Sequence, residues 1–403
     1  MKPGGWPSIL AVYLYGVLGV ACLSKMLPLA GDLQRALGAS PAQFALLLSM
    51  LALPAAVLAT VAGALVDRVG PRLVLILSAL IGSGVDAGYW FAPSLGAFQV
   101  LRLFEGLTMV GIFTAAPALL MATTADRRRV SAMTLWSTYT PTGFSLGLVI
   151  AAGFAGGPGW RWTFMLHGGL FLAAAALGLA LPRAEPRAAN AARKGVGARV
   201  AELLGAYAQS GPVRLALAFG LVICLGLGVS TVMPSFLSQV HGLSIGAASN
   251  LLAAANFSMI LGAFLTSFWL GSGRSAHLFY IGLGVVGSIA GVVLFAPGAP
   301  FAVVLAALCV WLMVSGAATS FALAVLPGVI DDPRRGAAAA GLFSQISSVV
   351  TLVTPPIWLG VFGHGGWGPF VGLIFGGWIL SFLFLPKAAT RFRSSPGAAA
   401  AVH

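Results

Sequence analysis

The 403-residue chain is poor in charged residues and in cysteine. Only 8% of its residues are charged, whereas soluble domains carry about 25%. So little charge does not cover a water-exposed surface, which excludes a soluble enzyme, a secreted disulfide scaffold and a disordered tail. The three cysteines, Cys22, Cys224 and Cys309, fall inside apolar runs without C-x-x-C spacing. This pattern favours small buried hydrophobic residues over metal ligands or disulfides.

Several signatures of catalytic and pore-forming membrane proteins are also missing. The sequence has no H-E-x-x-H motif and no Walker loop, so neither a zinc protease nor an ATP-driven pump is indicated. It shows no ring of charges or carbonyl filter of the kind that lines channels. We expect no enzyme activity, cofactor or metal.

Long apolar segments make up most of the chain: 59% of residues are hydrophobic and the mean hydropathy is +0.98. A membrane-spanning helix needs about 20 apolar residues. The segments are apolar on every face instead of alternating, which excludes a β-barrel. We predict an all-α integral membrane protein with twelve transmembrane helices, at residues 9–30, 43–66, 73–92, 96–122, 131–155, 163–182, 213–237, 244–270, 277–296, 300–328, 337–361 and 367–386.

The net charge of +13 arises from 22 Lys and Arg residues against 9 Asp and Glu. With the N-terminus inside, all but four of the basic residues fall on the cytoplasmic side. The exceptions are Arg35 and Arg161 in external loops, and Lys25 and Arg102 inside spans. This split fits the positive-inside rule with both termini cytoplasmic. Topology therefore explains the charge, nucleic-acid binding is not indicated, and a bacterial-like inner (plasma) membrane is expected.

A polar stretch at residues 183–212 divides the spans into two groups of six. We predict an N-terminal bundle at 1–182, a cytoplasmic linker at 183–212, a C-terminal bundle at 213–390 and a cytoplasmic tail at 391–403. Residues 196–209 of the linker fit either a short interfacial helix or a plain connection.

The two groups of spans repeat a pattern. The segment D-R-R-R-V-S-A-M-T-L-W-S at 126–137 is echoed about 207 residues later by D-P-R-R-G-A-A-A-A-G-L-F-S at 332–344. Each has basic residues, then small residues, an aromatic residue and a serine. We therefore expect two pseudo-symmetric six-helix bundles, as in transporters built from parallel repeats.

The strongest motif is G-A-L-V-D-R-V-G-P-R at 63–72, between the second and third spans. It resembles the G-x-L-x-D-R-x-G-R-[KR] signature of the major facilitator superfamily, with Pro71 where an Arg is usual. R-L-F-E-G at 102–106 resembles the R-x-x-[QE]-G motif of this superfamily, and W-R-W-T-F at 160–164 is also common there. The antiporter motif of the fifth span is poorly met by T-Y-T-P-T-G-F-S-L-G at 138–147. The resemblance implies a cytoplasmic gate formed by Gly63, Asp67, Arg68, Gly70 and Arg72.

Four ionisable residues lie within the apolar spans, where each charge costs about 2.5–3.5 kcal/mol on insertion scales. Lys25, Asp86 and Arg102 fall at a similar depth, roughly 10 Å from the external surface. Glu105 follows Arg102 by three residues and shares its helical face. We predict one neutralised cluster of two bases and two acids.

Two interpretations of this cluster stay open at this point. It holds spans together as a buried ion-pair set, or it titrates and binds substrate during transport. On the second interpretation, Glu105 or Asp86 carries the coupled proton with Arg102 as modulating partner, and Lys25 and Arg102 bind the substrate.

The C-terminal half has no Asp, Glu, Lys, Arg or His deep in a span. Its candidate substrate-binding residues are Asn256, Gln345 and Trp311. Serine and threonine in these spans are expected to bond their own helix backbone, and Phe321 fits either a substrate site or packing. His167, near the start of the sixth span, and His241 and His364 in external loops are expected to be solvated or interfacial.

These features together predict a monomeric secondary transporter that binds a small molecule, exchanges protons and sits in a lipid bilayer. We expect it to move an organic anion or amphipathic carboxylate by alternating access, coupled to protons. The alternative is a proton-antiport efflux pump for amphipathic drugs or lipids.

Overall fold

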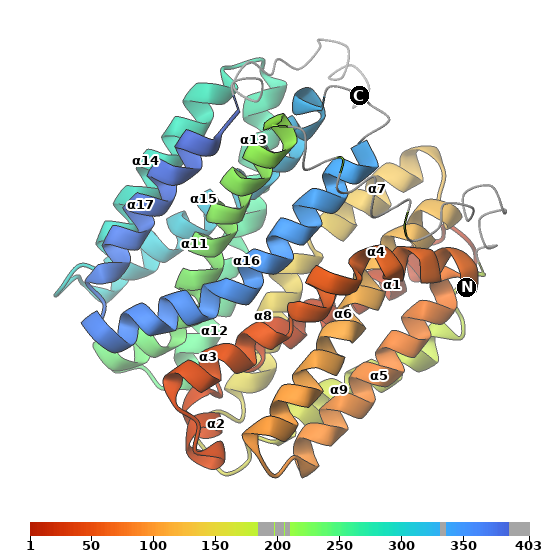
Figure 1. Ribbon diagram of the computed structural model, residues 1–403, viewed down its shortest axis with the longest axis horizontal. Coiled ribbons are helices and arrows are strands. Elements are labelled where there is room, and N and C mark those ends of the chain that lie inside the picture. Colours follow the sequence, from red (N-terminus) through yellow and green to blue (C-terminus); the bar gives the residue numbers. More distant parts are fainter. Residues whose placement is uncertain (184–196, 198–204, 206–209, 331–335, 387–403) are drawn as a thin grey trace. The chain divides into compact units, whose positions relative to one another are not determined.

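The computed structural model describes residues 1–183, 197, 205, 210–330 and 336–386, and every regular element within them is a helix (Figure 1). The segment 196–209, for which a short interfacial helix and a plain connection were both open, and the tail at 391–403 lie outside the described residues, apart from residues 197 and 205.

The helices of the first half are α1 (Trp6–Ser24), α2 (Ala30–Leu37), α3 (Pro41–Met50), α4 (Leu53–Val69), α5 (Pro71–Phe91), α6 (Leu95–Thr123), α7 (Asp126–Ser137), α8 (Tyr139–Ala152) and α9 (Trp162–Gly178). Those of the second half are α11 (Ser210–His241), α12 (Ile245–Asn256), α13 (Ser258–Gly271), α14 (Ala276–Leu294), α15 (Phe301–Val325), the 3₁₀ turn η1 (Leu326–Val329), α16 (Gly336–Gly365) and α17 (Pro369–Phe384).

The twelve predicted spans are confirmed as helical segments. In the described part of the chain, eight stretches are long and apolar enough to cross a membrane, and four shorter apolar helices supply the remaining spans. The predicted second, fifth and eighth spans are each built from two helices: α3 with α4, α7 with α8, and α12 with α13.

The first span is shorter than predicted. Helix α1 ends at Ser24, turns follow, and the eight-residue helix α2 begins at Ala30. Lys25 therefore stands directly after a helix end instead of inside a helix, yet its side chain is fully buried.

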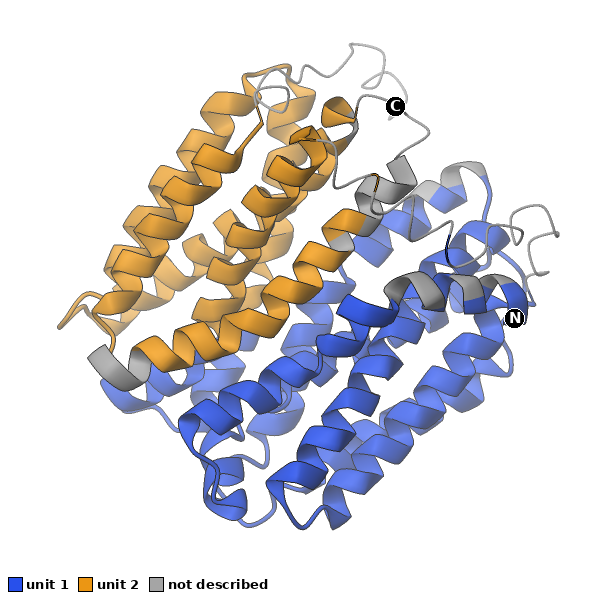
Figure 2. Ribbon diagram, in the orientation of Figure 1, with its two compact units in different colours: residues 1–200, 231–254 blue, residues 201–230, 255–403 orange. Residues whose placement is uncertain are grey.

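The chain divides into two compact units, residues 1–200 with 231–254 and residues 201–230 with 255–403 (Figure 2). Several corresponding helices have the same neighbours within each unit. In the first unit α6 packs against α4 and α5, and α5 packs against α9. In the second unit α15 packs against α13 and α14, and α14 packs against α17. This repetition is the internal two-fold pattern expected of the fold; the domain boundaries given above stay a prediction.

Matching glycines permit the closest helix contacts in both units. A Cβ added to Gly106 of α6 would lie 2.2 Å from the Leu51 carbonyl oxygen, next to the break between α3 and α4. A Cβ added to Gly316 of α15 would lie 2.2 Å from the Met259 carbonyl oxygen, next to the break between α12 and α13. Small residues allow such backbone approach in membrane helices, so each unit builds the same contact at the same place.

The contact at Gly106 gives a test of this packing. Gly106→Ala is expected to destabilise the protein by about 1–3 kcal/mol, because the new methyl group meets backbone that has no rotamer to change. Gly84→Ala is the matched control, since nothing lies within 4 Å of a Cβ added there. Thermal unfolding in detergent should show a lower Tm for Gly106→Ala alone. Equal Tm values for both variants would contradict the close approach.

Candidate functional site

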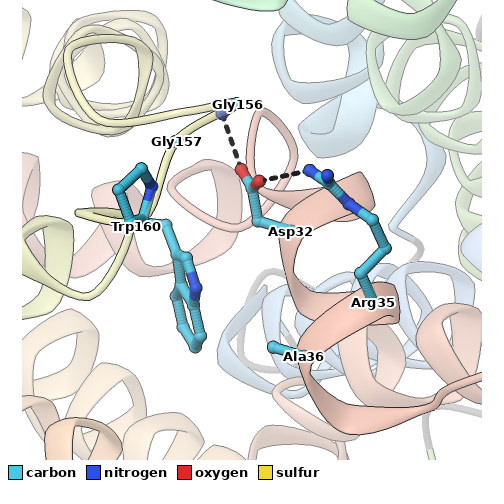
Figure 3. Close-up of a pocket in the computed structure, with 7 residues that line it drawn as sticks. Asp32, Arg35, Ala36, Gly156, Gly157 and Trp160 are labelled. Carbon is cyan, nitrogen blue, oxygen red and sulfur yellow. Dashed lines mark hydrogen bonds and ion pairs between the residues drawn. The ribbon is translucent and has the colours of Figure 1, made fainter.

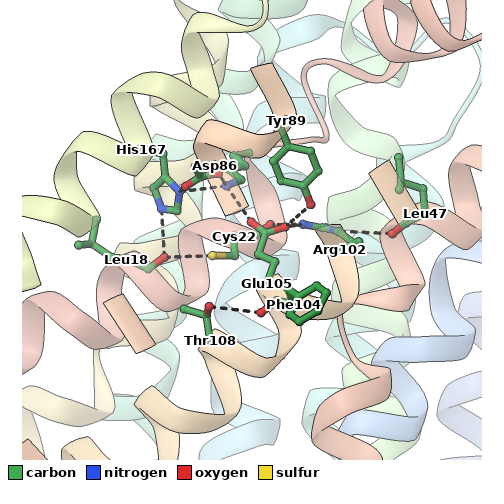
Figure 4. Close-up of polar contacts among 11 residues, drawn as sticks. Leu18, Cys22, Leu47, Asp86, Tyr89, Arg102, Phe104, Glu105, Thr108 and His167 are labelled. Atoms are coloured by element: carbon green, nitrogen blue, oxygen red, sulfur yellow. Dashed lines mark hydrogen bonds and ion pairs between the residues drawn. The ribbon is translucent and has the colours of Figure 1, made fainter. Parts of the chain in front are cut away.

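A cluster of buried ionisable side chains lies in the first unit (Figure 4). Lys25 follows α1, Asp86 belongs to α5, Arg102 and Glu105 belong to α6, and His167 belongs to α9. Each of the five side chains is at most 1% exposed. Ions in such surroundings require partners, because the cost of removing each from water is several kcal/mol.

The predicted neutral cluster is present. The Lys25 ammonium forms an ion pair with Asp86 Oδ1 and lies 2.7 Å from Glu105 Oε1. Arg102 Nη1 donates to Glu105 Oε2 at 2.7 Å across one helical turn. Each base thus faces a carboxylate, and Glu105 lies between both bases. The two positive and two negative charges balance.

Arg102 also donates hydrogen bonds to backbone carbonyl groups in the last turns of α1 and α3. Its Nη1 donates to the Cys22 carbonyl at 2.8 Å, in the last turn of α1, and its Nε donates to the Leu47 carbonyl at 3.3 Å, in the last turn of α3. Carbonyls at these ends lack a further helical N–H partner. The end of α1 and the break in the second span therefore supply acceptors for the guanidinium. Its Nη2 has no hydrogen-bond partner within the described part of the chain.

Aromatic side chains enclose the cluster. The Tyr89 hydroxyl donates to Glu105 Oε2 at 2.8 Å. The Lys25 ammonium lies 5.7 Å from the centre of the Tyr89 ring and 5.4 Å from that of Phe164. Such ring faces attract cations. His167 packs edge-on against Phe171 at 4.7 Å between ring centres.

The prediction that His167 is solvated or interfacial is wrong. The ring is completely buried, with Nδ1 at 2.7 Å from Asp86 Oδ2 and 3.0 Å from Lys25 Nζ. Its Nε2 lies 3.2 Å from the Leu18 carbonyl. His167 stands four residues after the external start of the predicted sixth span, close to the five and six residues that separate Lys25 and Asp86 from the external ends of their spans. Tyr89, one turn after Asp86 on α5, was also missed.

The arrangement combines two bases, two acids and one imidazole without exposed surface. A change of protonation at any member alters the charge balance of all of them. The cluster therefore suits either rigid ion pairing or the storage of a proton.

Comparison with known proteins decides the family. The family model of the Major Facilitator Superfamily matches residues 9–355. The chain belongs to the Major Facilitator Superfamily. No curated protein matches the sequence significantly.

Two solved transporters share this superfamily fold over almost the whole chain. A bacterial homologue of the human lysosomal transporter Spinster, inward-facing and unoccupied, gives a TM-score of 0.75 at 18% identity and covers 96% of each chain. The nucleoside transporter NupG, in a variant form, gives a TM-score of 0.72 at 15% identity, over 94% of this chain and 99% of that chain. At these identities the likeness shows the fold alone.

The superfamily motif at 63–72 forms the sharp connection between α4 and α5. Gly70 has φ of 90°, a left-handed conformation that favours glycine, and leaves one residue between the helices. Arg72 Nε donates to the Gly178 carbonyl at 3.1 Å, and its Nη2 donates to the Leu179 carbonyl. This places a cation at the negative end of α9.

No contact that would close a cytoplasmic gate is described for the other motif residues. Gly63 is half-buried and Arg68 is exposed, while the side chain of Asp67 lies outside the described part. The gate formed by these residues stays a prediction.

The candidate residues of the C-terminal half lie in the second unit. Asn256 is 2% exposed, Gln345 is half-buried, and Trp311 is 1% exposed with no hydrogen-bond partner for its Nε1 among the described residues. Phe321 packs against Tyr280, with 5.0 Å between ring centres. Ser230, Ser315 and Thr319 each donate to a carbonyl of their own helix, as expected.

Two other polar features are structural. A surface pocket includes Asp32, whose carboxylate binds Arg35 at 2.7 Å and accepts from the Gly156 amide at 2.7 Å (Figure 3). The carboxylate thus ties α2 to the loop after α8. The sequence G-F-S-L-G at 143–147 has the spacing of the G-x-S-x-G motif of hydrolases. In those enzymes the serine stands on a strand-to-helix turn, whereas this segment lies inside the helix α8.

Removal of Arg102 tests how strongly the cluster is coupled. Arg102→Ala leaves Glu105 short of one base and frees two buried carbonyls, so a loss of about 3–5 kcal/mol is expected. Arg35→Ala removes an ion pair whose arginine is 74% exposed, for which about 0.2–1 kcal/mol is expected. Thermal unfolding of both variants measures the difference. A similar Tm for the two variants would show that the buried pairing contributes little.

Proposed function

We propose that the protein is a proton-coupled secondary transporter that moves a small organic solute by alternating access. The favoured solute is an organic anion or an amphipathic carboxylate. The proposal includes a monomer in the inner membrane with both termini cytoplasmic. Membership of a transporter superfamily supports transport, and the buried cluster of the first unit carries the proposal of proton coupling.

Charge balance links a proton to an anionic solute. Glu105 faces both Lys25 and Arg102. Protonation of either candidate carrier, Glu105 or Asp86, would cancel one negative charge and leave a base without that partner. A solute carboxylate would then supply the missing negative charge. Binding a proton together with an anion adds no net charge to the cluster, and this avoids the cost of a lone buried ion.

Unpartnered donors support the choice of an anionic or hydrogen-bond-accepting solute. Arg102 Nη2 has no hydrogen-bond partner within the described residues, and it belongs to a fully buried guanidinium. Guanidinium groups bind carboxylates through two parallel hydrogen bonds. We propose Lys25 and Arg102 as contacts for the charged end of the solute, and Asn256, Gln345 and Trp311 for its other end.

The solute class is tested first by thermal shift. Purified full-length protein is heated with carboxylates, amino acids, lipids or drugs, because a ligand that binds only the folded state raises Tm. Carboxylates are expected to give the largest shifts. Shifts confined to drugs or lipids would favour the efflux-pump alternative.

Proton coupling is tested in proteoliposomes with the solute that this screen identifies. Wild-type protein should accumulate the solute along an imposed pH gradient. Glu105→Gln and Asp86→Asn should lower this accumulation at least tenfold while solute exchange continues, because exchange needs no net proton movement. Asp32→Asn, which alters a carboxylate outside the cluster, is the control. Wild-type accumulation by both cluster variants would refute proton coupling.

A further inference from the structure

His167 makes three polar contacts that together constrain its protonation. Its Nε2 lies 3.2 Å from the Leu18 carbonyl oxygen. Its Nδ1 lies 2.7 Å from Asp86 Oδ2 and 3.0 Å from Lys25 Nζ. The tautomer follows from the partners of the two ring nitrogens.

The contact with Leu18 fixes one proton. A carbonyl oxygen only accepts, so Nε2 must carry hydrogen. In a neutral ring the other nitrogen, Nδ1, then has a lone pair. That lone pair suits the Lys25 ammonium. It does not suit an ionised Asp86, whose Oδ2 also only accepts and lies 2.7 Å away.

The opposite neutral tautomer fails for the same reason. A proton on Nδ1 would satisfy Asp86, but Nε2 would then turn a lone pair toward the Leu18 carbonyl. Neither neutral tautomer with an ionised Asp86 satisfies both contacts. One additional proton satisfies both, either as an imidazolium beside a carboxylate or as a neutral ring that accepts from the Asp86 carboxylic acid.

Helices α1, α5 and α8 pack against α9. Beyond Asp86, the ionisable groups of the cluster around His167 are Cys22 of α1, Lys25 directly after α1, Tyr89 of α5, and Arg102 and Glu105 of α6. Lys25 and Arg102 offset the charges of Asp86 and Glu105. On α8 the ionisable residue is Tyr139, which packs against Trp136 and Phe113 instead. Tyr15 of α1 binds α9 two turns away, at the Ala174 carbonyl.

We propose that the His167–Asp86 pair holds the proton that the transporter exchanges, and that the conformation described here is the proton-loaded one. The proton enters from water and sits between Nδ1 and Oδ2, with no other bond made or broken. With this proton the cluster bears one net positive charge, and without it the cluster is neutral. The loaded state therefore favours an anionic solute. This inference rests on the proposed function and names the group that titrates.

Loss of the proton would make the contact repulsive. If Nε2 keeps its proton for the Leu18 carbonyl, the Nδ1 lone pair and the Asp86 carboxylate would then face each other at 2.7 Å. Either the ring turns away or α5 and α9 separate at this point. Deprotonation therefore acts directly on the contact between these two helices, which pack along their lengths.

The test is spectroscopic and needs no substrate. Full-length protein labelled with ¹⁵N-histidine is titrated from about pH 8 to about pH 5, the range in which histidine normally changes charge. Signals of His167 are assigned by their loss in His167→Gln. His277→Gln, which alters an exposed histidine, is the control. Infrared difference spectra of the same samples report a carboxylic-acid C=O band, assigned by its loss in Asp86→Asn.

The expected result is uptake of one proton by the pair during acidification, seen as imidazolium signals or as the carboxylic-acid band. Uptake should fall by one proton per molecule in either His167→Gln or Asp86→Asn. A neutral ring beside an ionised Asp86 at every pH would overturn the proposal, and so would a proton that is never released. If His167→Gln does not fold, the loss of proton uptake is measured in Asp86→Asn alone.

This result is separable from the transport test. If no solute accumulates along a pH gradient, the proposed function fails while the titration of the pair still stands. If accumulation is proton-driven but the pair never titrates, this inference alone is wrong.

Discussion

Pairing of charges that cannot reach water is the constraint on which the first unit depends. Lys25 and Arg102 are completely buried, and a lone buried ion costs several kcal/mol. Asp86 and Glu105 neutralise them, and Glu105 does so for both. The end of α1 and the break after α3 present carbonyl oxygens to Arg102 at the level of the cluster.

The spans and the clustering of the four charges could be predicted from the sequence, because hydropathy locates the spans and the rise per residue of a helix indicates which residues share a level. The helix breaks could not. Pro54 and Pro141 stand near breaks, whereas Pro117 and Pro234 lie inside continuous helices. Tertiary packing, such as that of Gly106 against Leu51, decides between these outcomes. Helix α2 was missed because its eight residues are amphipathic and too short to span.

Only the charged residues of the site could be predicted from the sequence. Full charges inside apolar runs stand out, so Lys25, Asp86, Arg102 and Glu105 were found. His167 and Tyr89 have no obligatory charge, and in a sequence they resemble interfacial or packing residues. The same depth counting that grouped the charges would have placed His167 with them. The carbonyls of Cys22 and Leu47 had no side-chain signal at all, since only helix ends expose them. The candidate residues of the second unit, Asn256, Gln345 and Trp311, offer hydrogen-bonding and aromatic groups without a formal charge.

Proton movement driven by the solute is the most direct measurement of the central claim that the buried cluster couples a proton to transport. Proteoliposomes in weak buffer receive a pulse of the transported solute, and a pH-sensitive dye records the proton flux. The expected result is a proton flux in step with solute entry for wild-type protein and none for the variant with both Asp86→Asn and Glu105→Gln. Solute entry without any proton movement in the wild type would contradict the claim.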